Sequence, residues 1–206
     1  MRLATLLVIV LSLTVPAAAQ VTVKGDPAAW QEVVAAYQRL GTLRSYRMKV
    51  TGPGVPGLGI SLEIVNPDRT RTLVDLGNGG YETIVVGKEA RGRVGDGPWQ
   101  CQAPPVGLGA GLPDPKAAKG EVTIARLRQV TIDGARTQSY QSSFSTASTA
   151  QPISLRLYVL QSGGVLRRVE ILDKAGKITI SVDYYDFNAP IKIELPECAE
   201  NTKDTR

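Results

Sequence analysis

The sequence predicts an α+β domain in which one amphipathic helix covers the concave face of a strongly curved antiparallel sheet. Three observations predict this fold. Apolar residues follow helical spacing once, near the N-terminus; about ten later stretches alternate apolar and polar residues; and turn sequences separate neighbouring stretches. Alternation gives each strand one apolar and one polar face, so the helix and the sheet can bury their apolar faces against each other.

Residues 1–19 have the form of a secretory signal peptide. Arg2 precedes an apolar stretch from Leu3 to Val15, and the small residues Ala17-Ala18-Ala19 suit cleavage after them. We expect a single mature domain of residues 20–206 that is periplasmic or secreted. The alternative is an uncleaved N-terminal anchor. No cysteine follows the small residues, so no lipobox-type lipid anchor is expected.

The helix is predicted to begin after Asp26, a good N-cap, with Pro27 at its first position. Gly41 can take the left-handed conformation just past its end. One face of this segment is apolar, at the spacing of about four helical turns. Its residues are Trp30, Val33, Val34, Tyr37 and Leu40.

The remaining elements are predicted to be strands. Those of the first half are 58–64, 69–76, 81–86 and 91–94, separated by the turn sequences Asn66-Pro67-Asp68, Asn78-Gly79 and Asp96-Gly97-Pro98. Those of the second half are 137–144, 153–159, 165–172, 178–184 and a short last strand, 191–195. Residues 121–132 fit either a strand or a short helix.

Residues 103–120 are rich in proline and glycine and too long for a simple hairpin. A functional loop or lid is expected here, with apolar contacts from Val106, Leu108 and Leu112. The spacing Gly107-x-Gly109-x-Gly111 is superficially that of a phosphate loop, but the flanking prolines do not suit the strand and helix that such a loop needs.

The two cysteines, Cys101 and Cys198, are expected to form a structural disulfide, because an exported chain meets an oxidising compartment. A redox-active pair would normally have C-x-x-C spacing. Closing so long a loop constrains the unfolded chain by about 4–5 kcal/mol in the chain-entropy model.

The chain of 206 residues has 24 lysines and arginines, 19 aspartates and glutamates, and no histidine. Histidine-based triads, dyads and metal ligation are therefore impossible. We expect no enzymatic activity, no metal and no other cofactor. The basic residues are scattered, so nucleic acid is not an expected partner.

Two groups of charged residues are candidates for chemistry. Asp183 and Asp186 could in principle act as acid and base in hydrolysis, facing Glu63 or Glu170, but their positions on polar strand faces or in a turn favour simple solvation. The arginine pairs fit a solvated sheet face, or alternatively a cationic rim for an anionic headgroup or a partner. These arginines are Arg69, Arg71, Arg91 and Arg93.

The apolar interior is the remaining candidate. It is lined mostly by aliphatic residues, since aromatic residues make up only 5% of the chain. A curved sheet with one helix could leave an unfilled apolar cavity suited to acyl chains. The residues alone leave this open against an ordinary solid core.

The stretch from Lys177 to Pro196 resembles the ending of proteins of the LolA/LppX/LprG superfamily, which are exported lipoprotein carriers and lipid-binding proteins. In that superfamily a D-F-N-x-P turn leads into a final short strand, and this chain has Asp186-Phe187-Asn188-Ala189-Pro190. The resemblance spans most of residues 26–196. Other matching motifs are Leu40-x-x-Leu43-x-Ser45-Tyr46, Asn66-Pro67-Asp68-Arg69, Gly97-Pro98-Trp99 and Ile132-Asp133-Gly134 ahead of Tyr140.

The resemblance implies an open half-barrel whose concave face holds acyl chains, and it favours a cavity over a solid core. The mycobacterial relatives are usually lipoproteins, whereas this chain has no anchor cysteine and resembles a soluble carrier. The implied protein is a monomer that binds a lipid or an acylated protein and could carry it between membranes, with transient contact to a membrane surface or an envelope protein. The alternative is an interaction or sensor module with a filled core.

The residues expected to bind the lipid come from the helix and from both halves of the sheet. They are Trp30, Val33, Tyr37, Leu40, Leu62, Ile64, Leu155, Leu157, Val159, Ile180, Val182 and Tyr184.

Overall fold

The computed structural model describes residues 21–53, 56–57, 59–75, 77, 79–102, 120–145 and 152–198. The predicted signal peptide and the predicted lid residues Val106, Leu108 and Leu112 lie outside the described residues. The described part contains one helix, α1 (Pro27–Thr42), and a single sheet of twelve strands. The strands are β1 (Val21–Gly25), β2 (Ser45–Thr51), β3 (Gly59–Val65), β4 (Arg69–Asp75), β5 (Tyr81–Val86), β6 (Glu89–Val94), β7 (Gln100–Gln102), β8 (Gly120–Ile132), β9 (Ala135–Ser145), β10 (Ile153–Leu160), β11 (Leu166–Leu172) and β12 (Ile178–Tyr185).

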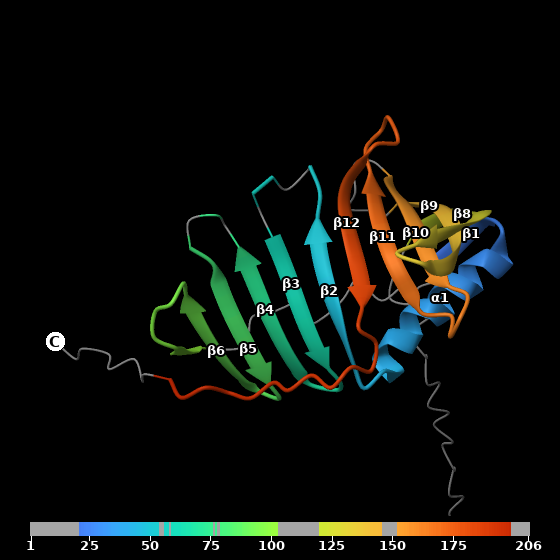
Figure 1. The fold of residues 1–206 in the computed structure, drawn as a ribbon. Coiled ribbons are helices and arrows are strands. Elements are labelled where there is room, and N and C mark those ends of the chain that lie inside the picture. Colours follow the sequence, from blue (N-terminus) through green and yellow to red (C-terminus); the bar gives the residue numbers. More distant parts are fainter. Residues whose placement is uncertain are drawn as a thin grey trace, which may run out of the picture.

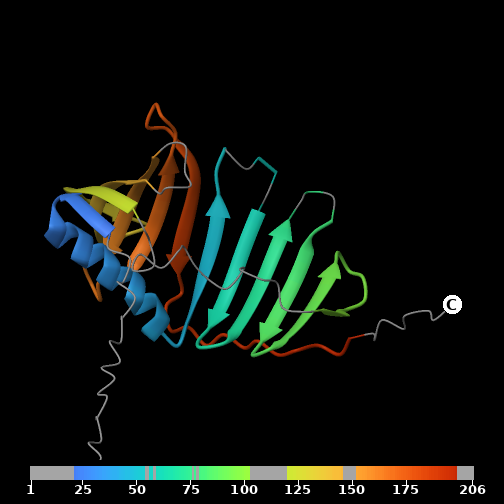
Figure 2. The same ribbon diagram turned by 180° about the vertical axis from the view of Figure 1, so that it is seen from behind.

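The sheet is built from two antiparallel meanders, β2–β7 and β8–β12, which meet where β12 pairs with β2. β1 lies parallel to β8 at one edge, and β7 forms the other edge, so the sheet is open. Figures 1 and 2 show the sheet curving away at the β8–β1 end. The structure has two more strands than the approximate prediction of ten. The stretch that was ambiguous in sequence is the long strand β8, and three strands, β1, β2 and β7, were not predicted.

The helix begins as its N-terminal signals predict, but the predicted C-terminal signal is wrong, because Gly41 lies within the helix and not past its end. The Asp26 side chain accepts a hydrogen bond from the backbone N–H of Ala29 (3.0 Å), and Pro27 occupies the first turn. The helix includes Gly41 and ends at Thr42, where the Leu43 N–H donates to the Leu40 carbonyl (3.3 Å).

The helix packs against only one end of the sheet. Its main contacts are with β1, β8, β10 and β11, and both views show it inside the curl of these strands. Its buried residues, among them Val33 and Leu40, join one hydrophobic cluster with residues of the strands. None of the described helical residues therefore covers the strands from β4 to β7.

The predicted last strand at 191–195 is wrong: the segment after β12 is extended but pairs with no strand. We call residues 187–198 the strap. It crosses the ends of β2–β6 (Figure 1) and finishes at the disulfide between Cys198 and Cys101 of β7, as predicted. A side chain holds its middle, since Arg69 Nη1 donates to the Ile193 carbonyl (3.0 Å).

Within the described residues, no helix is long and apolar enough to cross a membrane.

Candidate functional site

The register of β2–β7 sorts side chains by charge onto two faces. We call the inner face the one on which Tyr46, Met48 and Ile64 lie, since these residues belong to the cluster that includes α1. Following the pairing from strand to strand, every charged residue of β2–β7 lies on the opposite, outer face. The inner face of this half of the sheet is therefore uncharged.

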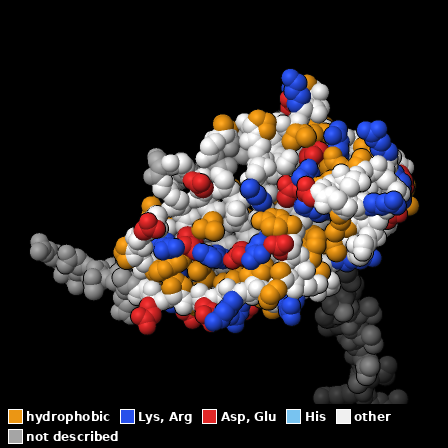
Figure 3. Space-filling view, viewed as in Figure 1, with side chains coloured by type: hydrophobic (Ala, Val, Ile, Leu, Met, Phe, Trp, Pro, Cys, Tyr) orange, Lys and Arg blue, Asp and Glu red, His pale blue; other side chains and the backbone are white. Residues whose placement is uncertain are grey.

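The outer face carries a continuous network of ion pairs. Arg47 bonds Glu63 (2.8 Å) and Asp186 (2.7 Å), and Arg71 lies between Glu63 (3.7 Å) and Glu82 (2.6 Å). Arg93 completes it with a 2.6 Å contact to Glu82. Figure 3 shows acidic and basic side chains alternating along this face.

Glu82 is the most enclosed member of this network, with 4% of its surface exposed. Burial by itself raises the pKa of the Glu82 carboxyl, but hydrogen bonds from Arg93 and Arg71 outweigh burial, and the pKa is lowered. The guanidinium of Arg93 also lies 4.7 Å from the centre of the Trp99 ring.

The charged candidates from the sequence are thus engaged within the protein. Arg69 holds the strap and Arg91 pairs with Glu89 (2.9 Å), so the two arginine pairs take part in intramolecular contacts on the outer face. Asp183 accepts from Arg168 (2.7 Å), and Asp186 pairs with Arg47 as described. In the part of the chain that the structure describes, no group of three or more potential metal ligands is found.

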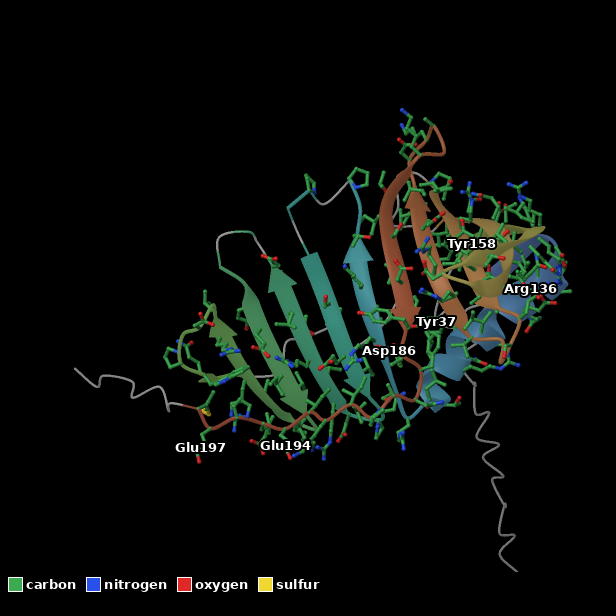
Figure 4. All side chains as sticks on the ribbon, in the orientation of Figure 1. Tyr37, Arg136, Tyr158, Asp186, Glu194 and Glu197 are labelled. Carbon is green, nitrogen blue, oxygen red and sulfur yellow. A yellow bond between two sulfur atoms is a disulfide. The ribbon has the colours of Figure 1, made fainter. Side chains whose placement is uncertain are left out.

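The structure brings all of the predicted lipid-binding residues into one cluster, on α1 and the inner faces of β3, β10 and β12. Those at its centre are buried: Val33, Leu40, Ile64, Leu157, Val159, Val182 and Tyr184. Those at its margin are half-buried: Trp30, Tyr37, Leu62, Leu155 and Ile180. Figure 4 shows Tyr37 near the end of β12, where the helix approaches the first meander.

Beyond this margin the inner face combines small side chains with the larger Val74, Tyr81, Val85 and Val94. The pairing places Thr70 and Thr72 of β4, Thr83 of β5, and Ala90 and Gly92 of β6 on it. Thr70 and Thr72 are half-buried, whereas Thr83 and Ala90 are buried. The half-buried margin and the small side chains beyond it together are the candidate site, which we call the inner apolar surface.

Sequence reasoning missed two residues at the centre of the cluster, Tyr46 and Met48, because it did not predict β2. The rings of Tyr46 and Tyr184 lie 6.3 Å apart. Burial raises the pKa of Tyr46 to about 12 and also raises that of Tyr184, whose hydroxyl has no hydrogen-bond partner among the described residues. The alternation of the apolar residues Tyr46, Met48 and Val50 with polar residues was the signal that could have predicted this strand.

Two of the pockets lined by described residues lie away from this surface. One of about 270 Å³ lies at the end of β4–β6, beside Leu73 and Arg93. The other, of about 310 Å³, lies between the strap and the start of β2, beside Arg44 and Pro190.

Three of the five motifs that carry the family resemblance converge near that second location: those that contain Leu40, Asn66 and Asn188. The Asn66 side chain donates to the carbonyls of Leu40 (3.0 Å) and Leu43 (2.7 Å), where α1 ends. The Asn188 side chain accepts from the backbone N–H of Arg44 (2.8 Å), at the entry to β2. The motifs therefore fix the helix end, the β3–β4 turn and the strap to one another.

These features define an open, mainly antiparallel sheet with one charged face and one apolar face. No family model matches the sequence, and no curated protein matches it. Among solved structures, lipoprotein LppX of Mycobacterium tuberculosis is similar, with a TM-score of 0.60 and 18% identity over 82% of this chain and 100% of LppX. The chain thus has an LppX-like fold, which confirms the fold that the resemblance predicted.

Two other similarities are weaker. The LolA superfamily protein NE2245 of Nitrosomonas europaea has 12% identity and a TM-score of 0.30, over 81% of this chain and 94% of that one. MucB, in the MucA/MucB complex of Pseudomonas aeruginosa, has 13% identity and a TM-score of 0.41, over 78% of this chain and 56% of that one.

Proposed function

We propose that the protein is an exported, monomeric binding protein for a lipid or a lipoprotein acyl chain, which it could carry between membranes. The ligand would lie on the inner apolar surface, against Trp30 and Tyr37 of the helix and across β2–β6. The supporting observation is the sorting of charge: each charged side chain of β2–β7 points to the outer face.

Burial of acyl chains is sufficient to drive such binding. Each methylene transferred from water contributes about 0.8 kcal/mol, so burial of a chain of about a dozen methylenes strongly favours binding. An uncharged inner face imposes no cost for desolvating ions. The binding role therefore requires no catalytic group.

The first test is native mass spectrometry of protein purified gently from cells, combined with titration of a fluorescent fatty acid. We expect co-purifying lipid and saturable probe binding. Absence of both would overturn the proposal. Capture of an envelope protein without lipid would instead support an interaction module with a filled core.

A pair of adjacent residues supplies a matched control. Thr72 is on the inner face of β4, and its neighbour Leu73 is on the outer face. We expect Thr72→Lys to weaken probe binding at least about tenfold, because an ammonium group must lose water beside the acyl chain. Leu73→Lys should bind normally, and circular dichroism would check that both variants fold.

The proposal also includes export. Residues 1–19 would be removed, so N-terminal sequencing of the protein from a native envelope fraction should begin near Gln20. Light scattering of the purified domain should give the mass of one chain.

A further inference from the structure

The two ends of the sheet differ in the apolar side chains that they expose. We call the apolar end the one where β4, β6 and β11 finish and where β10 and β12 begin. Of the large apolar side chains exposed among the described residues, all but Leu127 lie at this end. They are Leu73, Val94, Ile153 and Ile178, with 40%, 70%, 40% and 38% of their surfaces exposed.

The hairpin between β11 and β12 projects beyond the rest of the sheet at this end (Figures 1 and 3). Its turn is held by Asp173, whose Oδ1 accepts the backbone N–H groups of Ala175 and Lys177, each at 2.8 Å. The Asp173 N–H donates in turn to the Lys177 carbonyl (2.9 Å). The turn is therefore preorganised, and the one carboxylate in it is occupied by backbone donors.

Lys174 and Lys177 are exposed on this turn, and neither takes part in an ion pair within the described segments. Ile178 pairs with Leu172 at the base of the hairpin, and Leu172 pairs with Ser154, next to Ile153. Two ammonium groups thus stand beyond two exposed isoleucines.

We propose that this hairpin and Ile153 dock the protein on a lipid bilayer that carries anionic headgroups. Lysines on flexible stems reach phosphates while adjacent apolar side chains enter the interface. Of the acidic residues at the same end, Asp75 and Asp96 lie on the β4–β6 side, and Glu121 of β8 is paired with Lys24 (2.7 Å). Among the described residues, Lys174 and Lys177 therefore remain as unpaired cationic groups at this end, and both lie at the hairpin. This docking role goes beyond the proposed function and does not depend on it.

The test is flotation of the protein with vesicles of phosphatidylcholine, with and without phosphatidylglycerol. We expect binding to the anionic vesicles that falls as salt is raised to 1 M, where the screening length is about 3 Å. The double variant Lys174→Glu/Lys177→Glu should bind at least about 30-fold more weakly, since each basic side chain near such a surface contributes about a factor of five.

The matched control is Lys88→Glu/Lys192→Glu. It changes net charge equally, but Lys88 follows β5 and Lys192 lies on the strap, both at the other end of the strands. Equal losses in both double variants, or no vesicle binding by the unaltered protein, would overturn the proposal.

Two further variants examine the apolar contribution. Ile178→Ser retains all charges and should weaken binding by about fivefold if the side chain enters the interface. Ala175→Trp places a reporter on the turn, and its fluorescence should shift to the blue and be quenched by brominated lipid. A reporter that stays fully in water on bound vesicles would contradict the docking geometry.

Discussion

Glu32 joins the helix to the second meander. Its carboxylate accepts from Arg126 Nη2 (2.6 Å) and from the hydroxyl of Tyr140, and the Arg126 guanidinium lies 5.7 Å from the centre of the Tyr140 ring. The hydrogen bond from Arg126, followed by that from Tyr140, lowers the pKa of Glu32 below its ordinary value of 4.5. The charged form of Glu32 is therefore favoured in the folded state.

We expect Glu32→Gln to lower the free energy of unfolding at pH 7 by less than about 1 kcal/mol, because the side chain is partly exposed. A lowered pKa contributes stability above the unfolded value of 4.5, and this contribution disappears as pH falls through the folded value. Urea unfolding at pH 7 and near pH 3 should show the difference between variant and parent shrinking with acid. Glu194→Gln, which removes an exposed pair with Lys192, is the control.

Glu82 should be more sensitive than any exposed carboxylate of the same network. Glu82→Gln leaves Arg71 and Arg93 without their shared, nearly buried carboxylate partner. We therefore expect the free energy of unfolding, measured in urea, to fall by about 2–3 kcal/mol. Glu89→Gln breaks an exposed pair with Arg91 and should cost under about 0.5 kcal/mol. Equal effects would show that burial of Glu82 does not determine its contribution.

Among the elements, the strap depends on one covalent bond and a few side-chain contacts. The disulfide joins residues 97 apart, so Cys101→Ser/Cys198→Ser should lower the free energy of unfolding by about 4 kcal/mol. Arg69→Ala, which releases the Ile193 carbonyl and keeps the disulfide, should have a smaller effect. If the double variant were as stable as the parent, noncovalent contacts alone would hold the strap.

The sequence was informative for elements with uninterrupted alternation. The strands β3, β10 and β12 could be predicted because apolar residues occupy every second position. β2 was missed because Tyr46 and Met48 are a weaker signal between Arg47 and Lys49. β8 was ambiguous because its register with β9 shifts between Arg126 and Gln129.

The strap explains the one strand that was predicted wrongly. Ile191, Ile193 and Leu195 alternate as in a strand, and Ile193 is buried with 3% of its surface exposed. Alternation indicates an extended segment with one buried side. It does not indicate backbone pairing, and here Arg69 holds the segment in its place.

At the scale of the whole molecule, the candidate site divides into a part that sequence could predict and a part that it could not. Alternation identified the apolar face of each strand, and the predicted residues do lie together. The sequence could not predict that α1 covers only one end of the sheet. This cover depends on which strands neighbour β8 and on the pairing of β12 with β2.

Because α1 covers only one end of the sheet, we expect amide protection from hydrogen exchange to differ between the two ends. Amides of β9–β11, beneath or beside α1, should exchange with deuterium more slowly than those of β5 and β6. A bound acyl chain should slow exchange mainly in β3–β5, and hydrogen-exchange mass spectrometry would measure both effects. Uniform protection without ligand would contradict the unequal cover of the inner face.

The joining of β12 to β2 also sets an order of assembly. As the chain is synthesised, β2–β7 can pair in succession, but the second edge of β2 has no neighbour until residues 178–185 have been made. The disulfide of Cys101 likewise cannot form until Cys198 has been made. A truncated product therefore keeps an open strand edge, prone to aggregation, together with a free thiol. Formation of this single sulfur–sulfur bond distinguishes finished molecules from unfinished ones.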